Sequence, residues 1–157
     1  MSAIAAALRP IPIPKPDVLR RDPVAQSFML LRIAFTVAPI LFGIDKFANV
    51  LTNDWTRYLA PEFNDVIPGN AGDAMHIVGV VEIVAGLTVL VSPRFGGFLV
   101  AGWLAGIIVN LLIVGGYGDI ALRDFGLLLA ALTLARLASA YPGRAGAGHE
   151  PPARQGW

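Results

Sequence analysis

The sequence has no cysteine, only two histidines and few charged residues. The absence of cysteine excludes disulfides, thiolate metal sites, iron–sulfur ligation and thiol nucleophiles. Acidic and basic residues together make up 15% of the 157 residues, against about 25% in an ordinary soluble domain. A soluble chain of this length needs more polar surface than these residues supply, so the composition points toward a membrane protein.

The charge balance and the motifs that are missing exclude several classes of function. The formal net charge is +1, and no clustered basic or basic-aromatic patch indicates a nucleic-acid binder. The chain has no P-loop, dinucleotide fingerprint, nucleophile elbow or metal-ligand spacing. We therefore expect no catalytic residue and no metal site, and we do not expect the chain to act as an enzyme on its own.

Hydrophobic residues make up 55% of the chain, and the mean hydropathy is +0.65. Most of them lie in four apolar segments of about 20 residues, the length that crosses the hydrocarbon core of a bilayer as a helix. These segments cover residues 24–48, 74–91, 95–115 and 120–141. Because backbone groups in lipid must be paired within their own segment, helix is the expected conformation. The sequence thus predicts an all-α domain over residues 24–141, a bundle of four transmembrane helices.

Three further regions flank or interrupt the predicted spans. Residues 1–23 carry prolines at positions 10, 12, 14 and 16, which predict an extended N-terminal arm. In the loop 52–74, Trp55, Tyr58 and Leu59 have helical spacing, which predicts a short helix at the lipid headgroups with Trp55 and Tyr58 as interface anchors. Residues 142–157 form a tail rich in glycine and proline. We expect the arm, the tail and the helix faces to contact other membrane-protein subunits.

Basic residues are concentrated on one side of the predicted membrane. That side holds Arg9, Lys15, Arg20, Arg21, Arg94, Arg136, Arg144 and Arg154. The positive-inside rule then places both termini and the turn at Arg94 in the cytoplasm. The sequence predicts an integral protein of a bacterial inner (plasma) membrane.

Each predicted span carries a stripe of small or polar residues along one face. Small residues let membrane helices approach closely where lipid offers no hydrophobic drive. The candidates for helix packing are Gly43, Gly79, Gly86, Gly102, Gly106 and Asn110. These stripes predict a compact bundle with a polar seam.

Arg32 and Glu82 are charged residues deep within the first and second spans. A charge at the bilayer centre costs roughly 2.5–3.5 kcal/mol, so such side chains face the bundle interior and find a partner. Counted from the ends of their spans at the usual helical rise, Arg32 lies about 12 Å and Glu82 about 14 Å from the same membrane surface. The matching depths predict an intramembrane Arg32–Glu82 pair, either structural or part of a proton or substrate relay.

A second polar cluster is expected near the outer ends of the helices, beneath the loop that carries Trp55. As a candidate quinone or solute pocket it comprises Asp45, Lys46, His76, Tyr117, Asp119, Arg123 and Asp124. Because His76 is the only histidine within the predicted spans, bis-histidine haem held by the helices of this chain alone is excluded, and His76 is expected to pack or to form hydrogen bonds. The chain alone is expected to bind no cofactor, with a quinone or a structural lipid as the remaining candidates.

Several motifs together resemble the DoxX-like family of small integral membrane proteins. They are an arginine early in the first span, "FGIDKF" (42–47), "VEIVAGLTVL" (81–90) and "ALRDFGLLLAAL" (121–132). The resemblance covers roughly residues 30–137 and implies a four-helix membrane bundle. By motif position it implies functional roles for Arg32, Gly43, Lys46, Glu82, Gly86, Arg123 and Asp124.

The founding example of this family looks like a small membrane subunit of a thiosulfate:quinone oxidoreductase. We therefore expect this chain to be a non-catalytic accessory or structural subunit of a larger membrane redox or respiratory complex linked to quinone. Two alternatives stay open: a small-solute or proton transporter or channel that uses the polar seam, and a quinone-binding subunit of an oxidoreductase.

Overall fold

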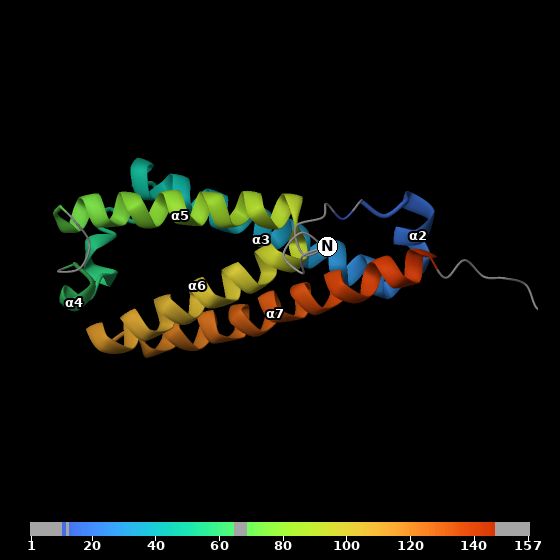
Figure 1. Ribbon diagram of the computed structural model, residues 1–157. Coiled ribbons are helices and arrows are strands. Elements are labelled where there is room, and N and C mark those ends of the chain that lie inside the picture. The colour runs from blue at the N-terminus through green and yellow to red at the C-terminus, as the bar shows by residue number, and fades with distance from the viewer. Residues whose placement is uncertain (1–10, 12, 65–68, 147–157) are drawn as a thin grey trace, which may run out of the picture.

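The computed structural model describes residues 11, 13–64 and 69–146, and this part of the chain contains helices and no strand (Figure 1). The prediction of an all-α protein is confirmed. The elements are α2 (Pro16–Arg21), α3 (Pro23–Ala48), the 3-10 helix η1 (Thr56–Tyr58), α4 (Pro61–Asn64), α5 (Ala71–Val91), α6 (Pro93–Val114) and α7 (Gly118–Gly146).

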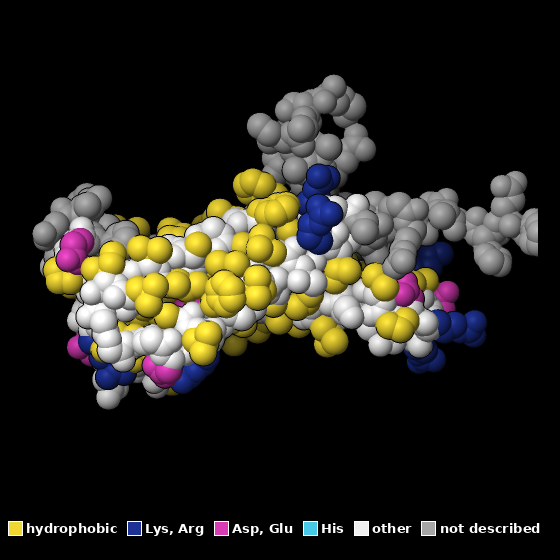
Figure 2. Space-filling model, turned by 90° about the horizontal axis from the view of Figure 1, so that it is seen from below, with side chains coloured by type: hydrophobic (Ala, Val, Ile, Leu, Met, Phe, Trp, Pro, Cys, Tyr) yellow, Lys and Arg dark blue, Asp and Glu magenta, His cyan; other side chains and the backbone are white. Residues whose placement is uncertain are grey.

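Three of the described helices, α3, α5 and α6, are long and apolar enough to cross a membrane. Hydrophobic side chains cover much of the face shown in Figure 2, and acidic side chains gather toward its two ends. These features indicate an integral membrane protein. Helix α7 is longer, but its described residues include Arg123, Asp124 and Arg136. A fourth spanning helix therefore stays a prediction.

The local sequence explains where the long helices begin and end. The Asp22 side chain accepts a hydrogen bond from the Val24 N–H at 2.9 Å and so caps α3. Asn70 and Asp73 form a reciprocal capping box at the start of α5. Helix α3 ends where Asn49 takes a left-handed conformation with φ 52°. These caps satisfy backbone groups that the helix ends leave unpaired.

The four long helices form two closely packed pairs, α3 with α5 and α6 with α7 (Figure 1). The pairs meet near the Ser92–Pro93 turn that joins α5 to α6, which we call the turn end, and they diverge toward α4, which we call the loop end. The connected apolar core lies in the half nearer the turn end, where Phe28, Val89 and Leu134 are fully buried. The fold is therefore two helix pairs joined chiefly at one end.

Glycines set the register of α3 against α5. A Cβ atom added to Gly43 would lie 2.5 Å from the carbonyl oxygen of Gly79, and one added to Gly86 would lie 2.7 Å from that of Thr36. Only a missing side chain allows backbones to approach this closely. Since these facing positions fix an antiparallel register, Glu82 lies level with Ile40.

On α6, the glycines divide into packed and open positions. A Cβ atom on Gly96 would lie 2.6 Å from the backbone of α5, and one on Gly97 would lie 2.9 Å from the backbone of α7. No atom lies within 4 Å of a Cβ added to Gly102 or Gly106, which are exposed. The prediction that Gly102 and Gly106 pack inside the bundle is wrong, because α6 turns them away from the other described helices.

The predicted flanking regions differ from the structure in three places. Pro16–Arg21 is helical, so the prediction of an extended arm is wrong there; residues 1–10 and 12 lie outside the described part. Helix α7 continues to Gly146, into the predicted tail, of which 147–157 are not described. In the loop, η1 and α4 are two short helical turns in place of one helix around Trp55.

Candidate functional site

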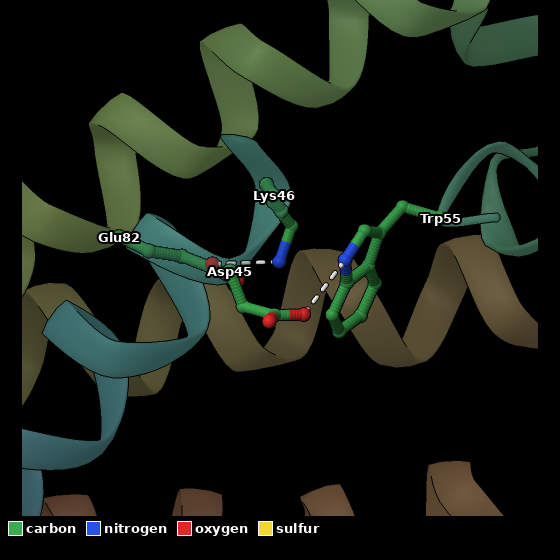
Figure 3. Close-up of polar contacts among 4 residues, drawn as sticks. All are labelled: Asp45, Lys46, Trp55 and Glu82. Atoms are coloured by element: carbon green, nitrogen blue, oxygen red, sulfur yellow. Dashed lines mark hydrogen bonds and ion pairs between the residues drawn. The ribbon is translucent and has the colours of Figure 1, made fainter. Parts of the chain in front are cut away.

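A buried ion pair joins α3 to α5 (Figure 3). The Nζ atom of Lys46 lies 2.7 Å from Oε2 of Glu82, and the two side chains are 5% and 10% exposed. Side chains of an α-helix lean toward its N-terminus. Because α3 and α5 are antiparallel, Lys46 at the end of α3 leans toward the middle of the bundle, and Glu82 in the middle of α5 leans toward the loop end. Their charged ends therefore meet.

Arg32 takes no part in this ion pair. Its Nη1 donates to the carbonyl of Ile11 at 2.9 Å, and its Nη2 donates to the carbonyl of Leu90 at 2.6 Å. The predicted Arg32–Glu82 pair is wrong, because the depth of Arg32 was counted from the start of a helix that extends well beyond the end of α5. Arg32 is level with Leu90, about 12 Å along α5 from Glu82 at the usual helical rise. Arg32 instead satisfies a carbonyl at the end of α5.

Trp55 covers the ammonium group of Lys46. The Nζ atom lies 4.2 Å from the centroid of the Trp55 ring, a cation–π contact. The indole N–H of Trp55 donates to Oδ2 of Asp45 at 3.1 Å (Figure 3). Oδ1 of Asp45 accepts from the backbone N–H groups of Val50 and Leu51, each at 2.9 Å. Asp45 thus fixes the chain as it leaves α3 and holds Trp55 against Lys46.

The segment of residues 49–60, which we call the strap, runs from the α3–α5 pair to the α6–α7 pair. The side-chain amide of Asn110 on α6 donates to the carbonyl of Tyr58 at 2.5 Å and accepts from the N–H of Ala60 at 2.8 Å. The ring of Tyr58 also lies 5.1 Å from the ring of Tyr117. Asn110, predicted to pack helices, therefore holds the strap.

An aspartate organises the turn inside the strap. Asp54 accepts hydrogen bonds from the Thr56 hydroxyl at 2.5 Å and from the Thr56 N–H at 2.9 Å. These two bonds, with help from the N–H and the charge of Arg57, hold the pKa of Asp54 below its usual value. The ionised carboxylate is thus the form that supports η1.

The structure divides the predicted outer cluster. Asp45 and Lys46 come together with Glu82, as described above. Asp119 and Arg123 form an exposed pair one helical turn apart, 2.9 Å between Oδ2 and Nη2. His76 is exposed and stacks on Phe47, with ring centroids 4.9 Å apart. Asp124 is half-buried on α7. The predicted cluster therefore does not converge as one pocket.

Sequence reasoning did not identify Trp103 as a member of the polar interior. From α6, its indole N–H lies toward Glu82 and is buried, without a hydrogen bond of normal geometry. The Thr36 hydroxyl on α3 is buried and likewise has no hydrogen-bond partner among the described residues. The polar interior thus combines the Lys46–Glu82 ion pair, the Trp55 ring over it, the Trp103 N–H directed toward Glu82, and the buried Thr36 hydroxyl.

Comparisons of this chain with protein-family models, with curated proteins and with solved structures find no match. Within the described residues, no group of three or more His, Cys, Asp or Glu side chains is placed to hold a metal ion. The resemblance to the DoxX-like family stays a prediction from the motifs of the sequence.

Proposed function

We propose that this chain is a DoxX-like integral membrane protein with four spanning helices, and that it serves as a non-catalytic accessory subunit of a larger membrane redox or respiratory complex linked to quinone. The observation that carries this proposal is the open face of α6 around Gly102 and Gly106. The occupant that this face fits is a transmembrane helix of a partner subunit.

The argument rests on how the chain uses its other glycines. Gly43 and Gly86 bring the backbones of α3 and α5 into contact. Gly102 and Gly106 have the four-residue spacing typical of close helix association, yet no atom lies within 4 Å of either added Cβ. Large apolar side chains such as Phe98 border them and are exposed. A small-residue face between apolar side chains favours packing of an added helix.

The charged groups Arg32, Lys46 and Glu82 of α3 and α5 are engaged inside the chain, which supports a structural role. Glu82 is paired with Lys46, and Arg32 donates to two carbonyl groups. Intramembrane charges that find such partners fix how helices pack against one another. The redox context of the proposal comes from the family resemblance.

The proposal includes a topology with both termini in the cytoplasm of a bacterial inner membrane, based on the distribution of basic residues. The chain has no cysteine, so single cysteines report topology cleanly. In intact spheroplasts, a membrane-impermeant maleimide is expected to label Asn53→Cys in the strap and to spare Arg94→Cys beside the turn. Both residues are exposed. The opposite pattern would overturn the orientation.

The test of the subunit proposal is purification of the tagged chain from its native membrane in a mild detergent, with mass spectrometry and a visible spectrum. We expect stoichiometric membrane partners, and haem or flavin bands contributed by them. The double variant Gly102→Leu/Gly106→Leu is expected to lose these partners, because the added side chains would fill the face that the partner helix occupies. Gly126→Leu on α7 is the matched control, since a Cβ atom there also meets no atom within 4 Å. A wild-type chain that purifies without partners would refute the proposal.

The buried Lys46–Glu82 pair favours a second candidate function, a small-solute or proton transporter that uses this polar interior. In that case the purified chain alone, in liposomes, conducts protons or solute, and Glu82→Gln abolishes the flux. A quinone-binding role, with His76 beside the Phe47 ring, predicts a quinone that copurifies and is lost with His76→Ala.

A further inference from the structure

We propose that the strap is a latch: its bonds hold the two helix pairs together at the loop end, and their release lets the pairs part and admits water to Lys46 and Glu82. This inference is independent of the partner subunit proposed above, because it concerns only contacts within the chain.

The first observation is that the two helix pairs are joined unequally at their two ends. At the turn end, Gly96 and Gly97 bring α6 against the backbones of α5 and α7. The connected apolar core lies in the same half, and none of its buried members on α5 is nearer the loop end than Ala85. Near the loop end, the buried apolar residues Ala60, Met75 and Leu111 are not part of this core, and Ala60 belongs to the strap itself. The connected core therefore secures the turn end, and the strap takes part in the packing at the loop end.

The second observation is that the strap spans the divergence between the pairs. At one side, Asp45 of α3 holds three N–H groups of the strap, those of Val50, Leu51 and the Trp55 indole. At the other side, Asn110 of α6 makes two hydrogen bonds to strap backbone. Among the described residues, no hydrogen bond of normal geometry at the loop end joins α3 or α5 directly to α6 or α7, and the Trp103 N–H of α6 only lies toward Glu82. The two Asn110 bonds, together with the contact between the rings of Tyr58 and Tyr117, therefore complete the connection.

The third observation is that the same segment covers the ion pair. Trp55 lies over Lys46, whose side chain is 5% exposed, and its indole is held by Asp45. If the strap leaves α6, the cover and the connection are lost together. The turn at Ser92 is the natural pivot, since α5 ends at Val91 and α6 begins at Pro93.

The chain provides a direct test, because it has only two lysines, Lys15 and Lys46. Lys15 is exposed and serves as the internal reference for labelling with a water-soluble amine acetylating reagent, read by mass spectrometry on the full chain in lipid nanodiscs. Asn110→Leu removes both bonds to the strap while keeping a side chain of similar size. We expect the acetylation rate of Lys46, relative to Lys15, to rise at least tenfold.

A second measurement tests whether the pairs part. Nitroxide labels on cysteines at exposed positions Ile77 and Leu122 report the loop end, and labels at Leu90 and Arg136 report the turn end. In Asn110→Leu, the loop-end distances are expected to lengthen and broaden, and the turn-end distances are expected to stay as in the wild type.

The matched control is Gln26→Leu. It removes a side-chain bond to a backbone carbonyl, 2.9 Å from Nε2 to the oxygen of Leu19, at the opposite end of the molecule. It is expected to change neither Lys46 labelling nor the loop-end distances. Wild-type labelling and distances in Asn110→Leu would overturn the latch. Faster Lys46 labelling in Asn110→Leu with unchanged loop-end distances would also overturn the latch. Distances that lengthen at both ends would overturn it too, because they indicate a general loosening of the bundle.

Discussion

The ion pair between Lys46 and Glu82 predicts a specific pattern of rescue between variants. Lys46→Met removes the ammonium group and leaves the Glu82 carboxylate without its partner, in a position where its side chain is 10% exposed. Breaking a buried pair by removing one partner costs about 3–5 kcal/mol of unfolding free energy, because an uncompensated charge stays buried. Glu82→Gln in the Lys46→Met background removes that charge, and we expect it to recover about 2–3 kcal/mol as a coupling energy.

The assay is reversible unfolding in mixed micelles, followed by circular dichroism, for the wild type, both single variants and the double variant. Arg32→Leu supplies the control, since Arg32 donates to carbonyl groups of Ile11 and Leu90 and does not contact Glu82. Arg32→Leu is expected to destabilise the chain, and Glu82→Gln is expected to give no rescue. Additive effects of Lys46→Met and Glu82→Gln, or rescue of Arg32→Leu by Glu82→Gln, would refute the assigned pair.

Two further predictions follow from the helix contacts and from the strap. Gly43→Leu is expected to lower the unfolding free energy by about 3 kcal/mol or more in the same assay, because an added Cβ would lie 2.5 Å from a carbonyl oxygen of α5. Gly102→Leu is expected to leave the unfolding free energy within about 0.5 kcal/mol of the wild type, because a Cβ atom there meets no atom within 4 Å. The pKa of Asp54 is lowered by its bonds to Thr56, so its support of η1 is present above the ordinary aspartate value and is lost as pH falls through the lowered pKa. A nuclear magnetic resonance titration of the Thr56 amide is expected to show a midpoint below 3.8, the ordinary value, and a midpoint at or above it would contradict the assignment.

The sequence was sufficient to predict the helical class and the membrane-spanning character of α3, α5 and α6. Both follow from the length and composition of apolar runs, which are local properties of the chain. The partner of Glu82 could not be predicted from such local properties. It depends on the register of α3 against α5, which is fixed where Gly43 faces Gly79. A depth counted from one helix end cannot include the offset between two helices.

Two residues show which signals were present but not used. Asp45 lies in the last turn of α3, where a carboxylate opposes the helix dipole and so indicates a compensating partner. The structure provides that partner in the N–H groups of the strap. Trp55 was assigned to the lipid interface from its amphipathic ring, and the same property suits it to cover Lys46. Gly102 and Gly106 carry no sequence signal that distinguishes an inner from an outer face.

The separation of Lys46 and Glu82 along the chain has a consequence for biogenesis. The ribosome makes Lys46 first, and Glu82 follows 36 residues later. At a synthesis rate of about 5–20 residues per second, the cation waits about 2–7 s for its counter-ion. Helix α3 is therefore expected to reach its final depth only when α5 arrives, so that the two helices leave the translocon together as one hairpin.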